Sequence, residues 1–492
     1  MKQPTMRKMS TWGAALLALL VTLTPGAKGQ TWETFVLNGS GGPYLSIVAD
    51  AAGNVFAGGY DSGPSGPQSG LVFGTTTGDE TNWYLSDDSN PDLAGGETAF
   101  ITGLAFDSNS NLWSAGELDP SEHSAYWYVR MSSSPTSGTN SWSTMDTFQY
   151  PAGNFSTAVS VAGDSIGNVY VAGWGTAGAL PAVQHWLVRK GTFSSADHTW
   201  SWTTVDDMEG DSYPTGIAFV PPGRNLPDGA LLVVGYTYGP NGEIALARRS
   251  LDGGATWETI NPFPPNAGFS VATAAASDAS GDIYVAGAIQ IPGTSGPNPP
   301  EEWLVRESLD GGTTWQTIDT YADVGELSIA ESVGFDAAGN PVVVGRSDGS
   351  DGRFHWVVRR PINGTWTNVD YYSAQGTGSD AEAWGVTSDA AGNLLVTGYT
   401  GLFPRSARWL VRRLAAPLGQ APSIAYKWNG SDHSLSLSIP TTAGASYALE
   451  STPSLSPAQW TSLSTLAGDG TTKAFPALSL TNQQGFYRVR IQ

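Results

Sequence analysis

A short pattern recurs seven times along this chain, six times clearly and once in a degenerate copy that ends at Gly235, and its spacing restricts the possible folds more than any other feature. The clearest copy, residues 164–173, reads Asp-Ser-Ile-Gly-Asn-Val-Tyr-Val-Ala-Gly, and every copy closes on a glycine. The D-x-x-G-N core predicts a turn, and the apolar run behind it predicts a strand. The closing glycines lie 52 to 62 residues apart, a period typical of propeller blades. They are Gly59, Gly116, Gly173, Gly235, Gly287, Gly345 and Gly398.

Two further columns follow these turns. A strand that carries an arginine recurs in six repeats, at Arg130, Arg189, Arg248, Arg306, Arg359 and Arg412. After the strand of the first six repeats comes a tryptophan, which in five cases has an aspartate four residues later: Trp83, Trp142, Trp202, Trp257, Trp315 and Trp366. The seventh repeat passes Leu414 without this tryptophan. The missing copy stands at the other end of the chain, as Trp32-Glu-Thr-Phe35.

This displaced strand predicts a closed ring. If the first strand completes the last blade, seven four-stranded sheets close without leaving an open edge. An open β-solenoid is the alternative, but it gives no reason for the last repeat to lack a strand that the N-terminus supplies. We therefore predict an all-β fold: a seven-bladed β-propeller closed by an N-terminal strand, plus a small C-terminal β-sandwich-like domain.

The remaining sequence divides into an export signal, a linker and a tail. Lys2, Arg7 and Lys8 precede the apolar run 14–23, which is too short to span a bilayer. Residues 1–29 are therefore expected to be a signal peptide that is removed. The propeller is assigned to 30–415, a linker to 416–422 and the C-terminal β domain to 423–492. We expect the protein to be secreted or held at the cell surface.

Charge and cysteine content exclude several classes of function. The chain has 44 acidic and 23 basic residues, a formal net charge of -21, which argues against nucleic acids and anionic membranes as partners. It has no cysteine, which excludes disulfides, thiolate catalysis and cysteine-ligated zinc. Its five histidines lack the paired spacing of a zinc site. We expect no metal, no cofactor and a monomer.

The D-x-x-G-N-V-Y-V-x-G repeats resemble those of secreted bacterial seven-bladed β-propeller proteins. Residues 250–257 and 308–315 also match S-x-D-x-G-x-T-W, the Asp-box or BNR turn known from sialidases and other propellers. The resemblance does not extend to catalytic sialidases, because no Arg-Ile-Pro segment is present and the first arginine after the signal is Arg130, a repeat position. It implies structural turns between the third and fourth blade strands, formed by Ser250, Asp252, Gly254, Thr256, Trp257, Ser308, Asp310, Gly312, Thr314 and Trp315.

Function is expected where the repeat is broken, because a feature present in every blade is explained by packing. On this ground the arginine column is assigned to stacking and ion pairing. The irregular connections should emerge on one face of the disc, opposite the D-x-x-G-N and Asp-box turns, and we place the segments 221–228 and 291–301 there. The candidate ligand-binding residues of this face are Tyr44, Glu97, Tyr150, His185, Asp211, Tyr213, Glu326, His355, Tyr371, Asp380, Glu382 and Trp384.

Aromatic rings beside carboxylates suit two hypotheses for this face. The first is a binding or scaffold propeller that recognises a polysaccharide or another surface polymer. The second is a glycan-acting hydrolase or lyase, in which two carboxylates must converge on one glycosidic bond. The sequence assigns no catalytic residue. The carboxylates available for the second hypothesis are Glu97, Asp211, Glu326, Asp380 and Glu382.

Overall fold

A computed structural model describes the chain in segments. These are residues 18–19, 32–37, 45–61, 68–76, 82–89, 98–121, 124–151, 155–177, 183–223, 225–239, 242–264, 268–294, 299–323, 327–373, 379–401, 407–415, 425–429, 434–441, 446–452, 460–468, 471–479 and 486–491. The expected signal peptide, apart from residues 18–19, and the expected linker lie outside them. Within these segments no helix is long and apolar enough to cross a membrane.

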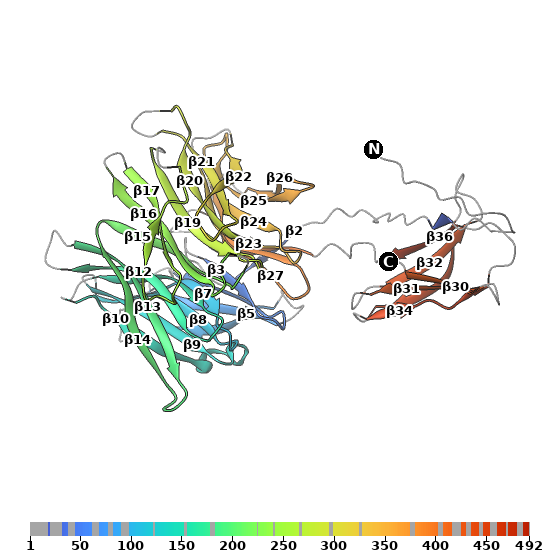
Figure 1. Cartoon of the computed structure of the whole chain (residues 1–492), viewed down its shortest axis with the longest axis horizontal. Helices are drawn as coiled ribbons and strands as arrows, with labels where there is room; N and C mark the ends of the chain where they lie inside the picture. Colours follow the sequence, from blue (N-terminus) through green and yellow to red (C-terminus); the bar gives the residue numbers. More distant parts are fainter. Residues whose placement is uncertain are drawn as a thin grey trace. The chain divides into compact units, whose positions relative to one another are not determined.

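The unit Trp32–Leu414 consists of seven four-stranded antiparallel sheets (Figure 1). Blades 1 and 2 are β3 (Ser46–Ala49), β4 (Val55–Asp61), β5 (Ser69–Thr75), β6 (Tyr84–Asp88), and β7 (Thr98–Phe106), β8 (Leu112–Ser121), β9 (Ser124–Ser132), β10 (Trp142–Phe148). Two 3-10 turns, η2 (Pro135–Ser137) and η3 (Thr139–Ser141), precede β10. Blades 3 and 4 are β11 (Ser156–Gly163), β12 (Val169–Ala177), β13 (Val183–Ser194), β14 (Thr199–Glu209), and β15 (Ser212–Val220), β16 (Ala230–Gly239), β17 (Gly242–Ser250), β18 (Glu258–Ile260).

The last three blades follow the same order. Blades 5 and 6 are β19 (Ser270–Ser277), β20 (Ile283–Gln290), β21 (Glu301–Ser308), β22 (Gln316–Tyr321), and β23 (Ser328–Phe335), β24 (Pro341–Asp348), β25 (Phe354–Ile362), β26 (Thr365–Tyr372). Blade 7 takes three strands from the end of the repeat region and one from its start: β27 (Asp380–Ser388), β28 (Leu394–Gly401), β29 (Arg408–Leu414) and β2 (Trp32–Val36).

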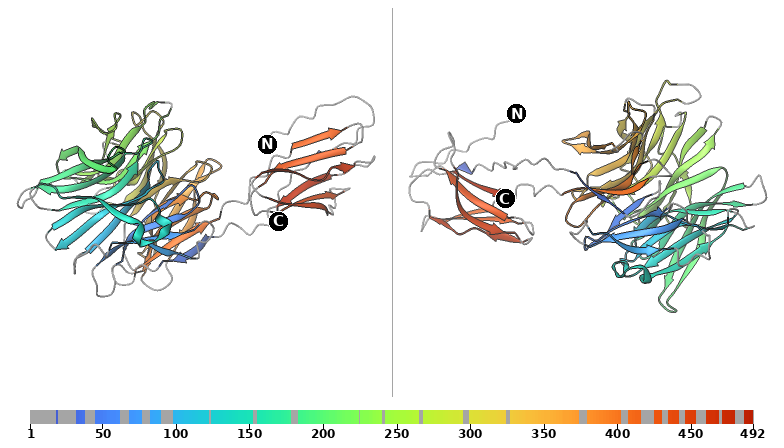
Figure 2. Two further views of the ribbon diagram at one scale, coloured as in Figure 1. Left: turned by 90° about the horizontal axis from the view of Figure 1, so that it is seen from below. Right: turned by 180° about the vertical axis from the view of Figure 1, so that it is seen from behind.

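The ring closes as the sequence predicts. Strand β2 pairs antiparallel with β29, with Trp32 opposite Leu414 and Val36 opposite Leu410. The first strand of each blade contacts that of the next, and β27 contacts β3 to complete the circle. Figure 2 shows the blue start of the propeller beside orange strands from its end. The prediction of seven blades with an N-terminal closing strand is therefore confirmed.

A tryptophan of one blade packs against the closing glycine of the next. The indoles of Trp186 and Trp356 are fully buried, and a Cβ atom on the facing Gly235 or Gly398 would lie 2.9 or 2.5 Å from the ring. Blade 4 carries Ala245 in place of the tryptophan, and there the ring of Phe263 approaches Gly287 instead. In blades 2 to 7 a Cβ atom on the closing glycine would also overlap a carbonyl oxygen of the first strand of the same blade. The glycine thus recurs because backbone and, in several blades, a neighbouring aromatic ring occupy the space of a side chain.

The arginine column forms ion pairs between blades. Arg189, for example, donates from Nε and Nη2 to Asp146 of the preceding blade at 2.7 and 3.0 Å, a two-pronged pair that is almost fully buried. Arg306 of blade 5 has no such partner: the outer strand of blade 4 pairs without a bulge and places Ile260 opposite Ala247, and Arg306 donates to the carbonyl of Pro262. The five pairs are Arg130–Asp87, Arg189–Asp146, Arg248–Asp206, Arg359–Asp319 and Arg412–Asp370.

The seam between blades 7 and 1 has neither member of this pair. Strand β2 pairs without the bulge of the other outer strands, so that Phe35 lies opposite Val411, where blades 1, 2, 3, 5 and 6 place aspartate. Phe73 stands in β5 where the other blades have arginine. Both halves of the pair are replaced together by apolar residues, so no buried charge is left alone at this seam. The arginine column therefore has a structural role, as expected from its repetition.

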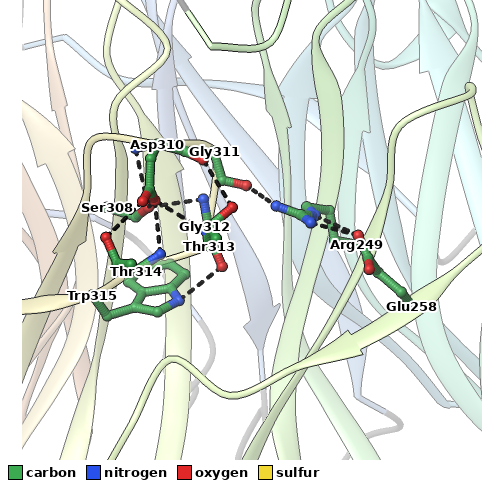
Figure 3. A network of polar contacts seen from close by, with 9 residues as sticks. All are labelled: Arg249, Glu258, Ser308, Asp310, Gly311, Gly312, Thr313, Thr314 and Trp315. Carbon is green, nitrogen blue, oxygen red and sulfur yellow. Dashed lines mark hydrogen bonds and ion pairs between the residues drawn. The ribbon is translucent and has the colours of Figure 1, made fainter.

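The two S-x-D-x-G-x-T-W segments fold into the same turn. In the second, the Ser308 hydroxyl accepts from Gly312 N and donates to Asp310, whose carboxylate accepts from the backbone and hydroxyl of Thr314 (Figure 3). Ser250, Asp252 and Thr256 repeat these bonds in the first segment. All donors to the carboxylate are local, so the aspartate holds the turn itself.

One segment lies on a different face from the one expected. Residues 221–228 connect β15 to β16, the first and second strands of blade 4, so they take the place of a D-x-x-G-N turn. Asn225 Nδ2 donates to the carbonyl of Leu309 in the second S-x-D-x-G-x-T-W turn at 2.6 Å. The prediction that this insertion lies on the irregular face is therefore wrong. The fourth repeat lacks a recognisable D-x-x-G-N turn, so the sequence does not show that the insertion joins the first and second strands.

The C-terminal residues form two small sheets that share one core. One contains β36 (Phe486–Ile491), β32 (Ser446–Thr452), β33 (Thr461–Ala467) and the two-residue β1 (Ala18–Leu19). The other contains β30 (Ala425–Asn429), β31 (Ser434–Pro440), β34 (Thr472–Ala474) and β35 (Leu478–Ser479). The shared core contains the buried side chains of Leu435, Leu437, Ile439, Tyr447, Leu449, Phe475 and Val489.

Candidate functional site

The propeller encloses a central cavity of about 740 Å³ that is lined by all seven blades. Its wall comes from the first strand of each blade and from the ends of several second strands. Since those ends lead into the irregular connections, this part of the cavity belongs to the face where the repeat varies. Its volume is in the range of small-molecule binding sites. We call this space the funnel.

The residue after each closing glycine gives the funnel its chemistry. The glycine itself is needed because neighbouring backbone and side chains leave no room for a Cβ atom, whereas the next residue differs from repeat to repeat. Side chains at five of these seven positions line the funnel: Tyr60, Glu117, Trp174, Tyr236 and Arg346. The remaining two are Ala288 and Tyr399. This ring is asymmetric, as a binding site requires and as packing alone does not.

Aromatic rings cover the funnel wall in blades 1 to 4. Tyr213 stacks on Tyr236 with ring centres 5.3 Å apart and meets Trp174 edge-on at 5.8 Å. Tyr60 and Phe100 form a second edge-to-face pair at 4.9 Å. Such rings present flat apolar faces with hydroxyl groups at their edges, which suits stacking against sugar rings.

An ionic cluster occupies the funnel wall in blades 6 and 7. Arg346 Nη1 donates to Glu382 Oε2 at 2.5 Å, and its Nη2 lies 3.3 Å from Glu331 Oε1. The Tyr399 hydroxyl donates to the other oxygen of Glu382 at 2.6 Å. The guanidinium also lies 5.4 Å from the centre of the Trp384 ring. One cation is thus shared by two carboxyl groups.

Glu331 and Trp384 depart from a repeated bridge between blades. The first strand of these blades has a bulge with one extra residue. In blades 2, 4 and 5 this bulge residue is threonine, and each hydroxyl donates to the first strand of the next blade. These threonines are Thr102, Thr215 and Thr273. Blades 6 and 7 place Glu331 and Trp384 there instead, on the funnel wall. A structural bond has been replaced by groups that face the cavity.

Burial changes the titration of the ionic cluster. Desolvation raises the pKa of Glu331 to about 7; the Arg346 charge opposes this shift and the Glu382 charge adds to it. Burial also raises the pKa of Glu117, although a hydrogen bond from the Thr157 hydroxyl works in the other direction. Both carboxyl groups therefore keep their protons to a higher pH than a free glutamate does.

The structure places the predicted site residues in different surroundings. Tyr213 and Trp384 line the funnel, and Glu382 lies in the cluster beside it. Asp380 accepts from the backbone nitrogen of Phe354 at 3.2 Å, which holds it at the start of β27. Asp211 stands at the start of β15, where its charge helps raise the pKa of Tyr213 after burial. Three further candidates lie outside the described residues: Tyr44, Glu97 and Glu326.

The two histidines share an arrangement away from the funnel. His185 stacks on Tyr150, and its Nδ1 lies 2.6 Å from Asp207. His355 stacks on Tyr371 and contacts Asp351 and Ser373 at 2.9 and 2.7 Å. Both imidazoles are largely buried, with side chains 12% and 10% exposed. Among the described side chains, no group of three or more His, Asp or Glu residues could hold a metal ion.

The sequence analysis missed Glu117, Trp174, Tyr236, Glu331 and Arg346. Four of them follow a closing glycine directly, so comparing that single position across repeats would have found them. Finding Glu331 requires knowing where the first strand bulges, because Glu331 is the bulge residue of blade 6 and takes the position that bridging threonines have in other blades.

No protein-family model matches the chain, and no curated protein matches it. Solved structures are similar at low identity. An α-L-arabinofuranosidase from Fusarium graminearum in complex with an iminosugar inhibitor is 12% identical with a TM-score of 0.39, over 63% of this chain and 91% of that one. Trypanosoma rangeli sialidase in complex with sialic acid is 11% identical with a TM-score of 0.38, over 88% and 78%. A gluconolactonase from Xanthomonas campestris is 12% identical with a TM-score of 0.36, over 76% and 87%.

Proposed function

We propose that this protein is an exported binding propeller that holds a glycan in its funnel. The observation that carries the proposal is that the funnel wall has an aromatic half, in blades 1 to 4, and a half that holds the ionic cluster, in blades 6 and 7, at positions where the repeat is broken. Rings such as Tyr236 can stack on sugar faces, and carboxylates such as Glu331 can accept from sugar hydroxyls. The signal peptide and the sialidase-type Asp-box turns fit a protein that acts outside the cytoplasm.

Glycan-array binding by the mature chain tests this proposal. We expect binding to at least one glycan, and we expect Trp174→Ala to weaken it at least tenfold, because the indole lines the funnel. Phe193→Ala is the matched control, since Phe193 is an exposed ring near the C-terminal end of β13, where the strand leads into its turn to β14 on the opposite face. Equal losses in both variants, or no glycan bound at all, would refute a glycan site in the funnel.

Hydrolysis is the second candidate, and the ionic cluster is the observation in its favour. Glu331 has a pKa of about 7, so part of it carries a proton near neutral pH, as a general acid needs. Glu382 contacts the same guanidinium. Incubating the bound glycan with the protein and analysing the products decides between the two candidates: cleavage that Glu331→Gln abolishes while binding remains would assign a hydrolase.

A further inference from the structure

The charges around the funnel are unequal. The lining contains Glu117, Glu331 and Arg346, and Glu382 lies directly beside it. Three carboxyl groups thus face one guanidinium, and Arg346 is already in contact with two of them. An acidic sugar would meet no available cation among these residues and would be repelled by the carboxylates.

Glu331 is the residue best placed to meet a ligand. Its side chain is only 6% exposed, yet it lines the funnel. In the described part of the chain its one polar partner is Arg346, at 3.3 Å from Oε1. Oxygen Oε2 is therefore left for a donor that enters the cavity. A buried carboxylate with a single long contact gains most from a charged donor.

The aromatic half of the funnel supports the same ligand charge. Aromatic faces attract cations, and the funnel presents the rings of Tyr60, Trp174, Tyr213 and Tyr236. Tyr213 and Tyr236 are stacked on each other and Trp174 is set edge-on, so the wall is already arranged before binding. Both halves of the funnel thus favour a ligand that combines a sugar ring with positive charge.

We infer that the glycan bound in the funnel carries protonated amines, as in a polymer of amino sugars. This inference rests on the proposed glycan binding and adds the charge of the ligand. One ammonium group would take the position beside Glu331 Oε2, and Glu117 is a second carboxyl group on the funnel wall that a further amine of the polymer could meet.

Proton release is the signature of such binding. Burial raises the pKa of Glu331 to about 7. An entering cation favours the ionised carboxylate, so a proton should leave as the ligand binds. The charged and titratable groups around Glu331 are Arg346 on β24, Glu382 on β27 and Tyr399 on β28. Glu301 on β21 interacts electrostatically with Arg346. Affinity for an amine should therefore rise between pH 5 and pH 7.

Calorimetric titration with two matched probes tests the inference: a glucosamine oligosaccharide and its fully N-acetylated counterpart. At pH 6, in two buffers of different ionisation enthalpy, we expect the amine probe to bind at least tenfold more tightly and to release about one proton. Glu331→Gln should abolish the proton release and weaken the amine probe about tenfold, without changing the N-acetylated one. Glu117→Gln, in the same assay, provides a second test should Glu331→Gln fail to fold.

Three other results would overturn the inference. Equal binding of both probes, or tighter binding of the N-acetylated one, would show a neutral glycan site. Binding of neither probe, while a neutral array glycan binds, would refute the amine and leave the proposed function standing. Binding of no glycan at all would remove both.

Discussion

Removing residues 30–37 from the mature chain is expected to lower the free energy of unfolding of the propeller by about 5 kcal/mol or more. The deletion strips β2 from blade 7 and exposes the edge of β29. It also removes Trp32, whose indole nitrogen donates to the carbonyl of Val369 at 2.8 Å and whose half-buried ring packs against the core formed by blades 6 and 7. Loss of a buried tryptophan alone typically costs about 3 to 5 kcal/mol.

Thermal and urea unfolding of three proteins checks this expectation. A chain that begins at Gln30 is the control, since it lacks only the expected signal peptide and keeps β2. The deletion should melt well below this control, and Trp32→Ala should fall between the two. An unchanged melt after deletion would mean that β2 contributes nothing to closing the ring.

Breaking one inter-blade ion pair is expected to cost about 3 to 5 kcal/mol. Arg359 donates from Nε and Nη2 to Asp319 at 2.7 and 2.8 Å, and both side chains are almost fully buried. Arg359→Ala leaves the Asp319 carboxylate buried without its charge partner, so most of the loss is the cost of that uncompensated charge. Urea unfolding of the variant measures the effect.

The chain itself supplies the matched control for this experiment. The seam between blades 7 and 1 places Phe35 and Phe73 where five other seams place aspartate and arginine, so both positions are apolar there. The double variant Asp319→Val, Arg359→Phe should therefore lose much less stability than Arg359→Ala, because it leaves no lone charge. Equal losses in the single and double variants would show that the packing of the arginine stem, and not its charge, holds the blades together.

The architecture could be predicted because the same sequence elements recur in each blade. Turn, strand, arginine and tryptophan recur at fixed positions, so a strand missing at one end and present at the other stands out. The face of an irregular segment was harder to predict. Residues 221–228 replace a D-x-x-G-N turn in the degenerate fourth repeat, and without that turn the sequence does not show which strands they connect.

The site was only partly predictable for a different reason. Tyr213, Glu382 and Trp384 stand out as charged or aromatic departures near irregular connections, whereas Arg346 resembles the structural arginines in type. Its role depends on pointing into the funnel between Glu331 and Glu382, and that arrangement joins side chains from two blades. Contacts between blades follow from the curvature of the ring, which no single repeat encodes.

The most direct test of the account is the glycan binding of a variant that restores the repeat, Glu331→Thr with Trp384→Thr. Both substitutions install the bridging threonine of blades 2, 4 and 5, so the fold should be kept or made more stable by about 1 kcal/mol per new hydrogen bond. The account predicts that glycan binding is lost at an unchanged or higher melting temperature. Binding of undiminished affinity, or a protein that no longer folds, would contradict the assignment of these two departures to function.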